Sequence, residues 1–502
     1  MRVLIIYPNK SMTTRVPLGL GYISAYLKDA GHEFMLFDTT FMKCSDNKSD
    51  DKLREENLQV TNPDFLKYNL VEENVNVFEE LTHMVTKFKP DIIGVSVVDP
   101  NYKFGMELLR FCKKSWNNIP TMCGGAIATL VPDEVIAEDC VDIVAIGEVE
   151  QQLVKYLSYC ESEETRRISM PNFWIKTLEG KIIKRYDHEL PDISKGLPPD
   201  LSIFDDRHFI RPLGGRMYRM ATVIWTRGCL FHCSYCANEL FYHTMNVSAK
   251  QYYRRKDTSL LIDELAQFKK QFNLNFIMFV DDIFPLHNVE IMKEFNILYK
   301  EKVNLPFSIN VQPMIVNEKS FQLAVDAGLK NVCCGIESGN ERIRREVLKR
   351  NYKDEDVIKV FDLAHKYNIR SSSFNIIGLP SETRNDIMDT IELNRKANPN
   401  SATVTFFHPY RGCELRKTCI KQGLVKSEED LYEDVYRQNS HLSMSQISKK
   451  ELEGLMASFQ LYVKLPKEYY NLIRMQEDQT NLDAKLIREK ILLPKFKEII
   501  TV

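Results

Sequence analysis

The chain has 502 residues, of which 44% are hydrophobic and 27% are charged, and its formal net charge is −2. This composition is typical of a globular protein with two or three domains. The balanced charge and the lack of a basic tail argue against nucleic acid or a membrane surface as a partner. No apolar stretch approaches the ~20 residues of a membrane-spanning helix. Twelve cysteines in no regular pattern, with no export signal, predict a protein of the reducing cytoplasm.

The first third of the chain alternates apolar runs with helical patterns. It predicts strands over 3–8, 33–38, 91–98, 121–125 and 141–147, and helices over 19–28, 75–88 and 103–114. This order is typical of a parallel sheet covered on both faces, which binds ligands beyond the carboxyl ends of its strands. The small residues predicted at that rim are Gly19, Ser96, Gly124, Gly125 and Gly147.

Two further features of this region guide its interpretation. No GxGxxG motif follows the first strand, which disfavours a dinucleotide ligand. The charged segment from Ser45 to about Glu73 predicts an excursion of poor order rather than a binding surface. Beyond it, residues 171–184 predict a hairpin that turns at Glu179-Gly180, and residues 191–206 predict a loop-rich connector between domains.

Three cysteines form the most informative motif of the chain. Cys229, Cys233 and Cys236 lie in Thr-Arg-Gly-Cys-Leu-Phe-His-Cys-Ser-Tyr-Cys, directly after the apolar run 221–225. A buried strand followed by a tight loop can gather thiolates around one inorganic centre, either an iron–sulfur cluster or zinc. Three thiols leave one metal corner open for a small molecule. A zinc site completed by His232 or His243 is an alternative.

After the motif, strands and helices alternate again. The strands predicted are 222–226, 276–282, 307–311, 332–337, 372–378 and 402–407. Six such units predict an open partial barrel, with functional groups at the carboxyl ends of its strands. Asp281 and Asp282 end the second strand, where capping of the next turn is favoured over metal binding. The helical patterns 452–462, 468–474 and 482–490 predict a cap over the open barrel.

The cysteine motif, with Tyr235 before its last cysteine, resembles the signature of the radical S-adenosylmethionine (SAM) superfamily. The runs Gly335-Ile-Glu-Ser-Gly339 and Gly378-Leu-Pro-Ser-Glu-Thr383 are similar to elements of radical SAM enzymes that carry a cobalamin domain. The glycines of residues 17–22, 124–125 and 146–150 resemble that cobalamin-binding domain.

The resemblance implies an α/β protein with four parts. These are a doubly wound, Rossmann-like cobalamin-binding sheet (1–165), a linker with a hairpin (166–215), a partial (βα)6 radical SAM barrel (216–415) and a C-terminal helical cap (416–502). It also implies three groups of binding residues. The cluster residues are Cys229, Cys233 and Cys236; the SAM residues are Tyr235, Gly335, Glu337, Ser338 and Ile377; and the cobalamin residues are Gly19, Ser96, Gly124, Gly125 and Gly147.

Two departures from the family pattern stand out. The DxHxxG motif, whose histidine binds cobalt in some cobalamin proteins, is absent, so no ligand to cobalt is expected from it. Arg411-Gly412-Cys413 stands where the family usually has Pro-Gly-Thr after the sixth strand, which leaves the role of this loop open.

The activity that the resemblance implies is radical chemistry with a 4Fe–4S cluster, SAM and cobalamin as cofactors. A 5′-deoxyadenosyl radical would abstract hydrogen from the substrate, and cobalamin would deliver methyl to an unactivated carbon or phosphinate phosphorus of a small molecule. A reducing protein such as flavodoxin or ferredoxin would supply electrons. Oxidative cyclisation or rearrangement by the same architecture is one alternative, and a non-catalytic, zinc-stabilised binding module is another. The sequence names neither the substrate nor a catalytic residue.

Overall fold

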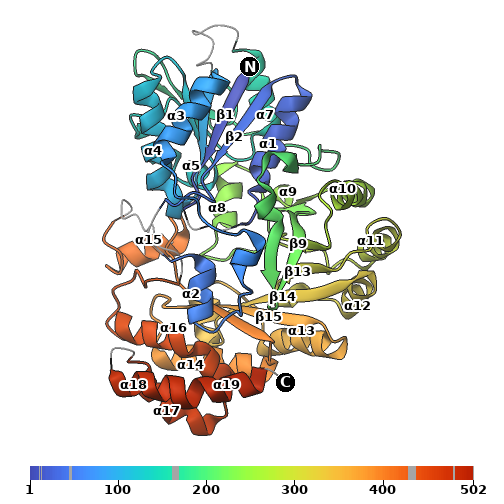
Figure 1. Cartoon of the computed structure of the whole chain (residues 1–502), viewed down its shortest axis with the longest axis vertical. Coiled ribbons are helices and arrows are strands. Elements are labelled where there is room, and N and C mark those ends of the chain that lie inside the picture. Colours follow the sequence, from blue (N-terminus) through green and yellow to red (C-terminus); the bar gives the residue numbers. More distant parts are fainter. Residues whose placement is uncertain are drawn as a thin grey trace.

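The computed structural model describes residues 1–10, 12, 14–44, 48–160, 169–427, 437–478 and 481–500. Three parts follow one another along the long axis of the molecule in Figure 1: an N-terminal α/β part, a second α/β part built on a curved sheet, and a group of C-terminal helices. Among the described residues, no helix combines the length and the apolar content that crossing a membrane requires.

The N-terminal part is built on a seven-stranded sheet of order β2-β1-β3-β4-β5-β6-β7. Its parallel strands are β1 (Arg2–Tyr7), β2 (Glu33–Asp38), β3 (Ile92–Ser96), β4 (Thr121–Gly124) and β5 (Ile143–Ala145). The chain changes direction between β1 and β3, which is the point where doubly wound sheets bind ligands. The predicted hairpin is confirmed as β6 (Phe173–Lys176) and β7 (Ile182–Ile183), which extend this sheet in antiparallel fashion.

Helices cover both faces of this sheet, as the sequence predicts. They are α1 (Leu18–Asp29), α3 (Val77–Phe88), α4 (Tyr102–Ser115), α5 (Ala126–Leu130), α6 (Pro132–Ala137) and α7 (Glu150–Ser158). Successive residues of β1 point to opposite faces. Val3 and Ile5 therefore pack in the core under α1 and α7, whereas Leu4 and Ile6 pack in the core under α3 and α4.

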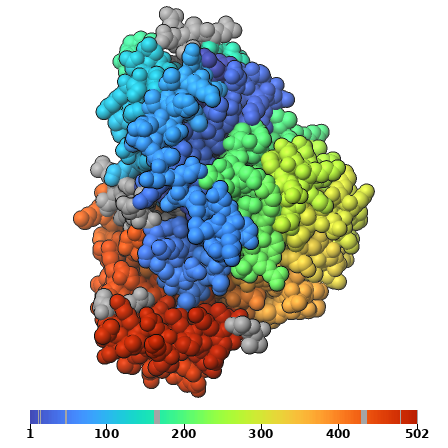
Figure 2. All heavy atoms as spheres, in the orientation of Figure 1, coloured from blue at the N-terminus to red at the C-terminus, as the bar shows by residue number. Residues whose placement is uncertain are grey.

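The charged segment after β2 is ordered, so its predicted disorder is wrong for the residues that the structure describes. It forms α2 (Asp50–Glu56) and the short helix Phe65–Tyr68. The segment leaves the N-terminal part and lies against the curved sheet, where it forms the blue surface between the green and red parts of Figure 2. Gln59, near its middle, binds the carbonyl of Val404, 345 residues further along the chain, and a contact so distant leaves no sign in the local sequence.

The second sheet has the order β16-β15-β14-β13-β12-β9-β8. Six strands are parallel, as predicted: β9 (Arg216–Val223), β12 (Phe276–Phe279), β13 (Phe307–Val311), β14 (Leu329–Glu337), β15 (Arg370–Ile377) and β16 (Ser401–Phe406). Because β8 (Ile210–Leu213) pairs only with β9, the described sheet stays open and does not close into a barrel. The predicted first strand, 222–226, is displaced: β9 ends at Val223, and Thr226–Arg227 form the separate strand β10, paired with β11 (Arg254–Arg255).

Helices pack along the outer face of this sheet. They are α10 (Thr258–Gln271), α11 (Val289–Lys302), α12 (Glu318–Ala327), α13 (Asp354–Lys366) and α14 (Arg384–Ala397). Among them, α10 to α13 lie at the right of Figure 1. The inner face remains available to line a cavity. The cysteine motif lies between β10 and α8 (Ala237–Thr244), and α9 (Ala249–Tyr252) leads back to β11.

The C-terminal helices cover the open edge of the sheet, as the sequence predicts. They are α15 (Glu414–Lys421), α16 (Lys449–Lys464), α17 (Tyr470–Gln476), α18 (Leu482–Ile487) and α19 (Leu493–Ile500). Apolar residues of α16 pack on β16 and α14. Two glutamines donate to backbone carbonyls of the edge strand: Gln460 to Ala402 O (2.9 Å) and Gln59 to Val404 O (2.9 Å). Side chains thereby satisfy acceptors that a free edge would expose.

The turn after β15 depends on a buried carboxylate. Glu382 is fully buried, and its Oε2 accepts hydrogen bonds from the backbone N–H groups of Gly378 (2.6 Å) and Leu379 (3.0 Å). Gly378 has φ +78°, a conformation that glycine adopts without strain. Burial raises the pKa of Glu382 to about 8, in spite of the two N–H donors.

We expect Glu382 to make the protein less stable as the pH rises. The folded state holds the proton up to about pH 8, whereas the unfolded chain releases it near its ordinary pKa of 4.5. The contribution of Glu382 to stability is therefore full below pH 4.5 and is lost as the pH rises through 8, by an amount on the order of a few kcal/mol. Glu382→Gln should flatten this decline in denaturant unfolding between pH 5 and 8. The surface variant Glu341→Gln should keep the wild-type slope; an equal slope for Glu382→Gln would contradict the assignment.

Candidate active site

The cysteine loop is shaped by one glycine and closed by one backbone hydrogen bond. Gly228 has φ +88°, and a Cβ at this position would lie 2.6 Å from the carbonyl oxygen of Tyr252. The chain therefore turns here only with glycine. Cys236 N donates to Cys233 O (3.0 Å), and Cys236 is the residue that precedes the first turn of α8.

Asp281, at the end of β12, fixes the start of the loop. Its Oδ1 accepts from Trp225 N (2.9 Å), Thr226 N (2.6 Å) and Thr226 Oγ1 (2.8 Å). Burial raises the pKa of Asp281 to about 7. Asp281 therefore holds the backbone between β9 and β10, a structural role other than the predicted capping of the turn that follows β12. Asp282 lies beside Asn238 and the backbone of Gly228, and burial raises its pKa as well.

The three thiols are close enough to influence one another. Burial raises the pKa of Cys229 to about 12, and it raises the pKa of Cys233 and Cys236 too. Neighbouring thiols of the motif add to the increase at Cys229 and Cys236. Because thiolates are the metal ligands, a bound cationic centre would displace these protons and offset the cost of burying the charges.

The spacing of the thiols does not match a single zinc ion. Zn–S bonds of about 2.3 Å in a tetrahedron place sulfur atoms about 3.8 Å apart. Among the described residues, the one set of three or more potential ligands whose ligand atoms all lie within 4.8 Å is Glu138, Asp139 and Cys140, not the cysteine motif. The histidines do not complete a zinc site either. His232 contacts Tyr242 and Glu239, His243 contacts Glu239, and the side chains of both histidines are more than half exposed. The wider separation suits a larger inorganic cluster.

Next to the cysteines lies a buried group of charges that sequence reasoning missed. Arg350 donates to Tyr235 Oη (2.9 Å) and to Gly335 O (2.9 Å), and its guanidinium lies 3.4 Å from Glu337 Oε1. Burial raises the pKa of Glu337, and Arg350 opposes that shift. Arg350 thus joins three of the predicted SAM residues. No local motif marks it, since its partners are 13, 15 and 115 residues away.

The surroundings of Gly335, Ser338 and Ile377 differ in the room that they leave for a ligand. Gly335 has no room for a side chain, because a Cβ would lie 2.5 Å from Glu337 Oε1. Ser338 is fully buried, with its hydroxyl next to Thr390 Oγ1 (3.5 Å). Ile377 is also fully buried, and it packs in the core with α14 and α16. Contacts of these residues with SAM stay predictions.

All five residues predicted at the rim of the N-terminal sheet line one cavity. This junction cavity, of about 480 Å³, includes Gly19, Ser96, Gly124, Gly125 and Gly147 in its lining. Its opposite wall comes from the cysteine loop, helix α8 and the loop after β12, and includes Gly228, Cys236, Asn238, Phe241 and Asp282. Cys236 is the one cysteine of the motif in this lining. The cavity therefore lies directly between the two predicted cofactor sites.

The glycines of the rim serve two purposes. A Cβ at Gly19 would meet no atom within 4 Å, so this residue leaves the cavity open. Gly125 and Gly147 have φ +93° and +76°, and a Cβ at Gly147 would lie 2.3 Å from Met245 Sδ. The wall around them is largely apolar, with Ile5, Val95 and Met122 among its residues. An apolar wall with glycines at its edge suits a large, flat organic cofactor.

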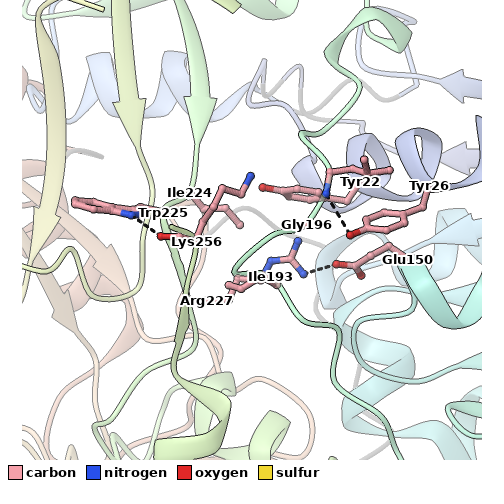
Figure 3. A pocket seen from close by; sticks show the side chains of 10 residues that line it. Tyr22, Tyr26, Glu150, Ile193, Gly196, Ile224, Trp225, Arg227 and Lys256 are labelled. Carbon is pink, nitrogen blue, oxygen red and sulfur yellow. Dashed lines mark hydrogen bonds and ion pairs between the residues drawn. The ribbon is translucent and has the colours of Figure 1, made fainter. Parts of the chain in front are cut away.

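An ion-pair cluster joins the cysteine loop to the rim, and Figure 3 shows one of its pairs, between Arg227 and Glu150. Arg227, two residues before Cys229, pairs with both Glu148 and Glu150, which directly follow the rim residue Gly147. Arg254, paired with Arg227 across β10 and β11, also binds Glu148. Burial alone would raise the pKa of Glu148, but the two guanidinium groups hold it below its ordinary value. The Arg227 guanidinium also lies 4.3 Å from the centre of the Tyr22 ring.

The loop that departs from the family pattern makes a second contact between the two parts. Arg411 has an exposed fraction of only 2%, and its guanidinium binds Asp99 Oδ1 (2.7 Å) and Glu134 Oε2 (2.9 Å) of the N-terminal part. It also lies 4.4 Å from the centre of the Tyr102 ring. The role of this loop, left open by the sequence, is therefore to dock the two parts on one another.

Comparison with protein families identifies both parts. Residues 223–393 match the model of the Radical SAM superfamily, and residues 10–157 match that of the B12 binding domain. Cytidylyl-2-hydroxyethylphosphonate methyltransferase of Streptomyces wedmorensis is 24% identical over 486 residues, which cover 87% of this chain and 85% of that protein. Anaerobic magnesium-protoporphyrin IX monomethyl ester cyclase of Rubrivivax gelatinosus is 22% identical over 428 residues, which cover 83% and 69%.

A similar fold occurs in a solved structure of the cobalamin-dependent SAM radical enzyme OxsB with aqua-cobalamin and SAM bound. The TM-score is 0.66 at 13% identity, and the match covers all of this chain and 72% of that one. The two matching domain families imply a 4Fe–4S cluster, SAM and cobalamin as cofactors. The three thiols, one buried and two half-buried, and the apolar, glycine-edged junction cavity fit these groups chemically.

Removing Arg227 should destabilise the protein strongly, because Glu148 and Glu150 would remain buried without their shared partner. We expect Arg227→Met to lower the free energy of unfolding by about 3–5 kcal/mol. Adding Glu150→Gln should recover part of this loss. The control Arg185→Met removes a more exposed pair with Asp187 and should leave denaturant unfolding unchanged. Equal stabilities of Arg227→Met and the wild type would show that the cluster does not hold the two parts together.

Proposed function

We propose that this chain, a member of the radical SAM enzymes that carry a B12-binding domain, is a methyltransferase acting on an unactivated carbon, or a phosphinate phosphorus, of a small molecule. When bound, the cluster and SAM supply a 5′-deoxyadenosyl radical, and cobalamin supplies a methyl carrier. The protein has to hold these groups and the substrate in one enclosed place.

The observation that carries the proposal is the shared lining of the junction cavity. Rim residues of the B12-binding domain form one wall, and Cys236 and Asp282 belong to the other. A substrate radical formed near the cysteine loop would thus face the predicted cobalamin rim with no domain movement. In this arrangement, Cys229, Cys233 and Cys236 are proposed to bind the cluster, and Gly19, Ser96, Gly124, Gly125 and Gly147 to border cobalamin.

Arg350 and Glu337 are proposed to form the polar end of the SAM site. Tyr235 is tied to Arg350, so the cysteine loop and β14 are fixed relative to each other at this point. SAM carries an ammonium and a carboxylate, and the buried carboxylate–guanidinium pair offers a complement to each. The reaction also needs an external reductant, and a flavodoxin or ferredoxin is the proposed donor.

Oxidative cyclisation is the second candidate, because one relative that matches 83% of the chain is named a cyclase. The two reactions differ in their by-products. Methyl transfer through cobalamin consumes one SAM as methyl donor and another as radical source, so it yields both S-adenosylhomocysteine and 5′-deoxyadenosine. Cyclisation yields no S-adenosylhomocysteine.

Anaerobically reconstituted protein, incubated with SAM, cobalamin, a reductant and candidate substrates, should therefore form both by-products and a product heavier by one methyl group. Mass spectrometry measures all three. Turnover that gives 5′-deoxyadenosine without S-adenosylhomocysteine would exclude methyl transfer and favour cyclisation.

Cys229→Ala, Cys233→Ala and Cys236→Ala should each lose the brown colour and the absorbance near about 400 nm that Cys-bound iron–sulfur clusters show. The matched control Cys44→Ser changes a thiol outside the motif and should retain the cluster. Iron content that stays at the wild-type level in the motif variants would contradict the proposed ligands.

A further inference from the structure

A second, larger cavity lies inside the curved sheet. This lumen cavity, of about 720 Å³, is lined by alternate residues of neighbouring strands: Ser308 and Asn310 of β13, Asn331 and Cys333 of β14, and Arg370 and Ser372 of β15. Residues of one strand that are two positions apart share a face. The inner face of the sheet is therefore the wall of the cavity. Segment α2 and the loop after β1 close it from the N-terminal part.

The lining of the lumen cavity is strongly basic. Five arginines contribute to it: Arg15, Arg54, Arg211, Arg370 and Arg437. Lys10 and Lys464 add two more cationic groups, whereas the acidic residues in the lining are Asp50 and Asp51. The chain as a whole has a net charge of −2, so this excess of positive charge is local to the cavity.

The two carboxylates are already paired. Asp50 binds Arg437, and Asp51 lies 3.6 Å from Arg54 Nη1. Within the described part of the chain, Arg15, Arg211 and Arg370 form no ion pair with a carboxylate. Arg211 donates to Thr222 Oγ1 (3.2 Å), and the Nε atoms of Arg211 and Arg370 are buried with no hydrogen-bond partner. All three arginines line the same cavity, from β8, β15 and the loop after β1.

The enclosure makes this arrangement costly while the cavity holds only water. Burial lowers the pKa of Arg211 to about 9, and the neighbouring Arg15 and Arg54 lower it further. Arg370 is half-buried, and burial lowers its pKa as well, whereas Arg15 is an exposed residue at the edge of the lining. Buried charges without partners are rare in proteins because desolvation and mutual repulsion both oppose them. An anionic ligand would relieve both.

The lumen cavity adjoins the proposed reaction site. Val280, directly after β12, lines both the lumen cavity and the junction cavity. Cys333 precedes Gly335, the partner of Arg350, by two residues on β14. A molecule that fills the lumen cavity can therefore reach toward the cysteine loop.

From this geometry we infer that the substrate of the proposed reaction is a polyanionic small molecule whose phosphoryl or carboxylate oxygens are bound by Arg15, Arg211 and Arg370. That the bound molecule is a substrate rests on the proposed function. That it is an anion rests on the lumen cavity alone. Guanidinium groups bind phosphoryl and carboxylate oxygens in bidentate fashion. The uncharged polar wall contributed by Asn310, Asn331 and Ser372 would bind hydroxyl or amide groups in the body of the molecule.

The test is isothermal titration of the reconstituted full-length protein with inorganic pyrophosphate, citrate and uncharged glycerol. We expect saturable binding of at least one anion, weakened by added salt, and none of glycerol. Arg211→Gln and Arg370→Gln should each raise the dissociation constant by about tenfold or more, since each removes a charge-assisted contact. The surface control Arg185→Gln should bind as the wild type. Preference for pyrophosphate would indicate a phosphoryl substrate, and preference for citrate a polycarboxylate.

The melting temperature of each variant, measured without ligand, distinguishes loss of anion binding from loss of folding. Without ligand, Arg211→Gln and Arg370→Gln should melt no lower than the wild type, because each removes a buried, repelling charge. Lower melting of both variants, no saturable binding of either anion, or equal binding by all variants would overturn the inference. Failure of methyl transfer is recognised separately, by absent S-adenosylhomocysteine while anion binding persists.

Discussion

The buried contact between Arg227 and the two glutamates Glu148 and Glu150 is the constraint on which the rest of the site depends. Its arginine immediately precedes the cysteine loop, and its glutamates immediately follow the glycine rim. A buried ion pair adds little net stability, since desolvation offsets much of the attraction. It nevertheless fixes the distance between its charges, because the free energy of the folded state rises when either buried charge loses its partner. Two loops that must face each other across a cofactor site are thereby fixed at one separation.

Arg411 repeats this device at a second point. Arg411 lies in the loop after β16, the last strand of the curved sheet. Its guanidinium binds Asp99 and Glu134 of the N-terminal part. One contact alone would leave the two parts free to rotate about it, whereas two contacts on different strands restrict that rotation. The charged segment after β2 adds a third connection, since its residue Gln59 donates to the carbonyl of Val404 on the edge strand. The junction cavity is thus a fixed space, which suits a reaction that has to exclude water.

Local spacing made part of this site predictable and left part of it hidden. The cysteines and the rim glycines were recognisable because their pattern is short, and the five rim residues do meet in one cavity. The order of six parallel strands followed from the alternation of apolar runs. Arg350 was missed, and the roles of Arg227 and Arg411 were not recognised, because the partners of all three lie far away in the sequence. Segment 48–73 was misjudged for the same reason: a short charged helix appears disordered until the sheet that it covers is known. Ile377 packs in the core with α14 and α16, and its predicted contact with SAM stays a prediction.

The two cavities differ in the polarity of their linings. The junction cavity has apolar walls and glycine edges, whereas the lumen cavity carries arginines without carboxylate partners. A radical reaction at an unactivated carbon cannot use the polarity of the reacting atom for recognition, because a C–H bond offers almost none. Binding energy has to come from groups elsewhere on the molecule. Charged groups held by Arg211 and Arg370 would fix one end of a substrate, and the length of the molecule would then decide which carbon reaches Val280 and the space beyond it. On this physical ground, the distance between the arginines and the cysteine loop would select the site of the proposed reaction.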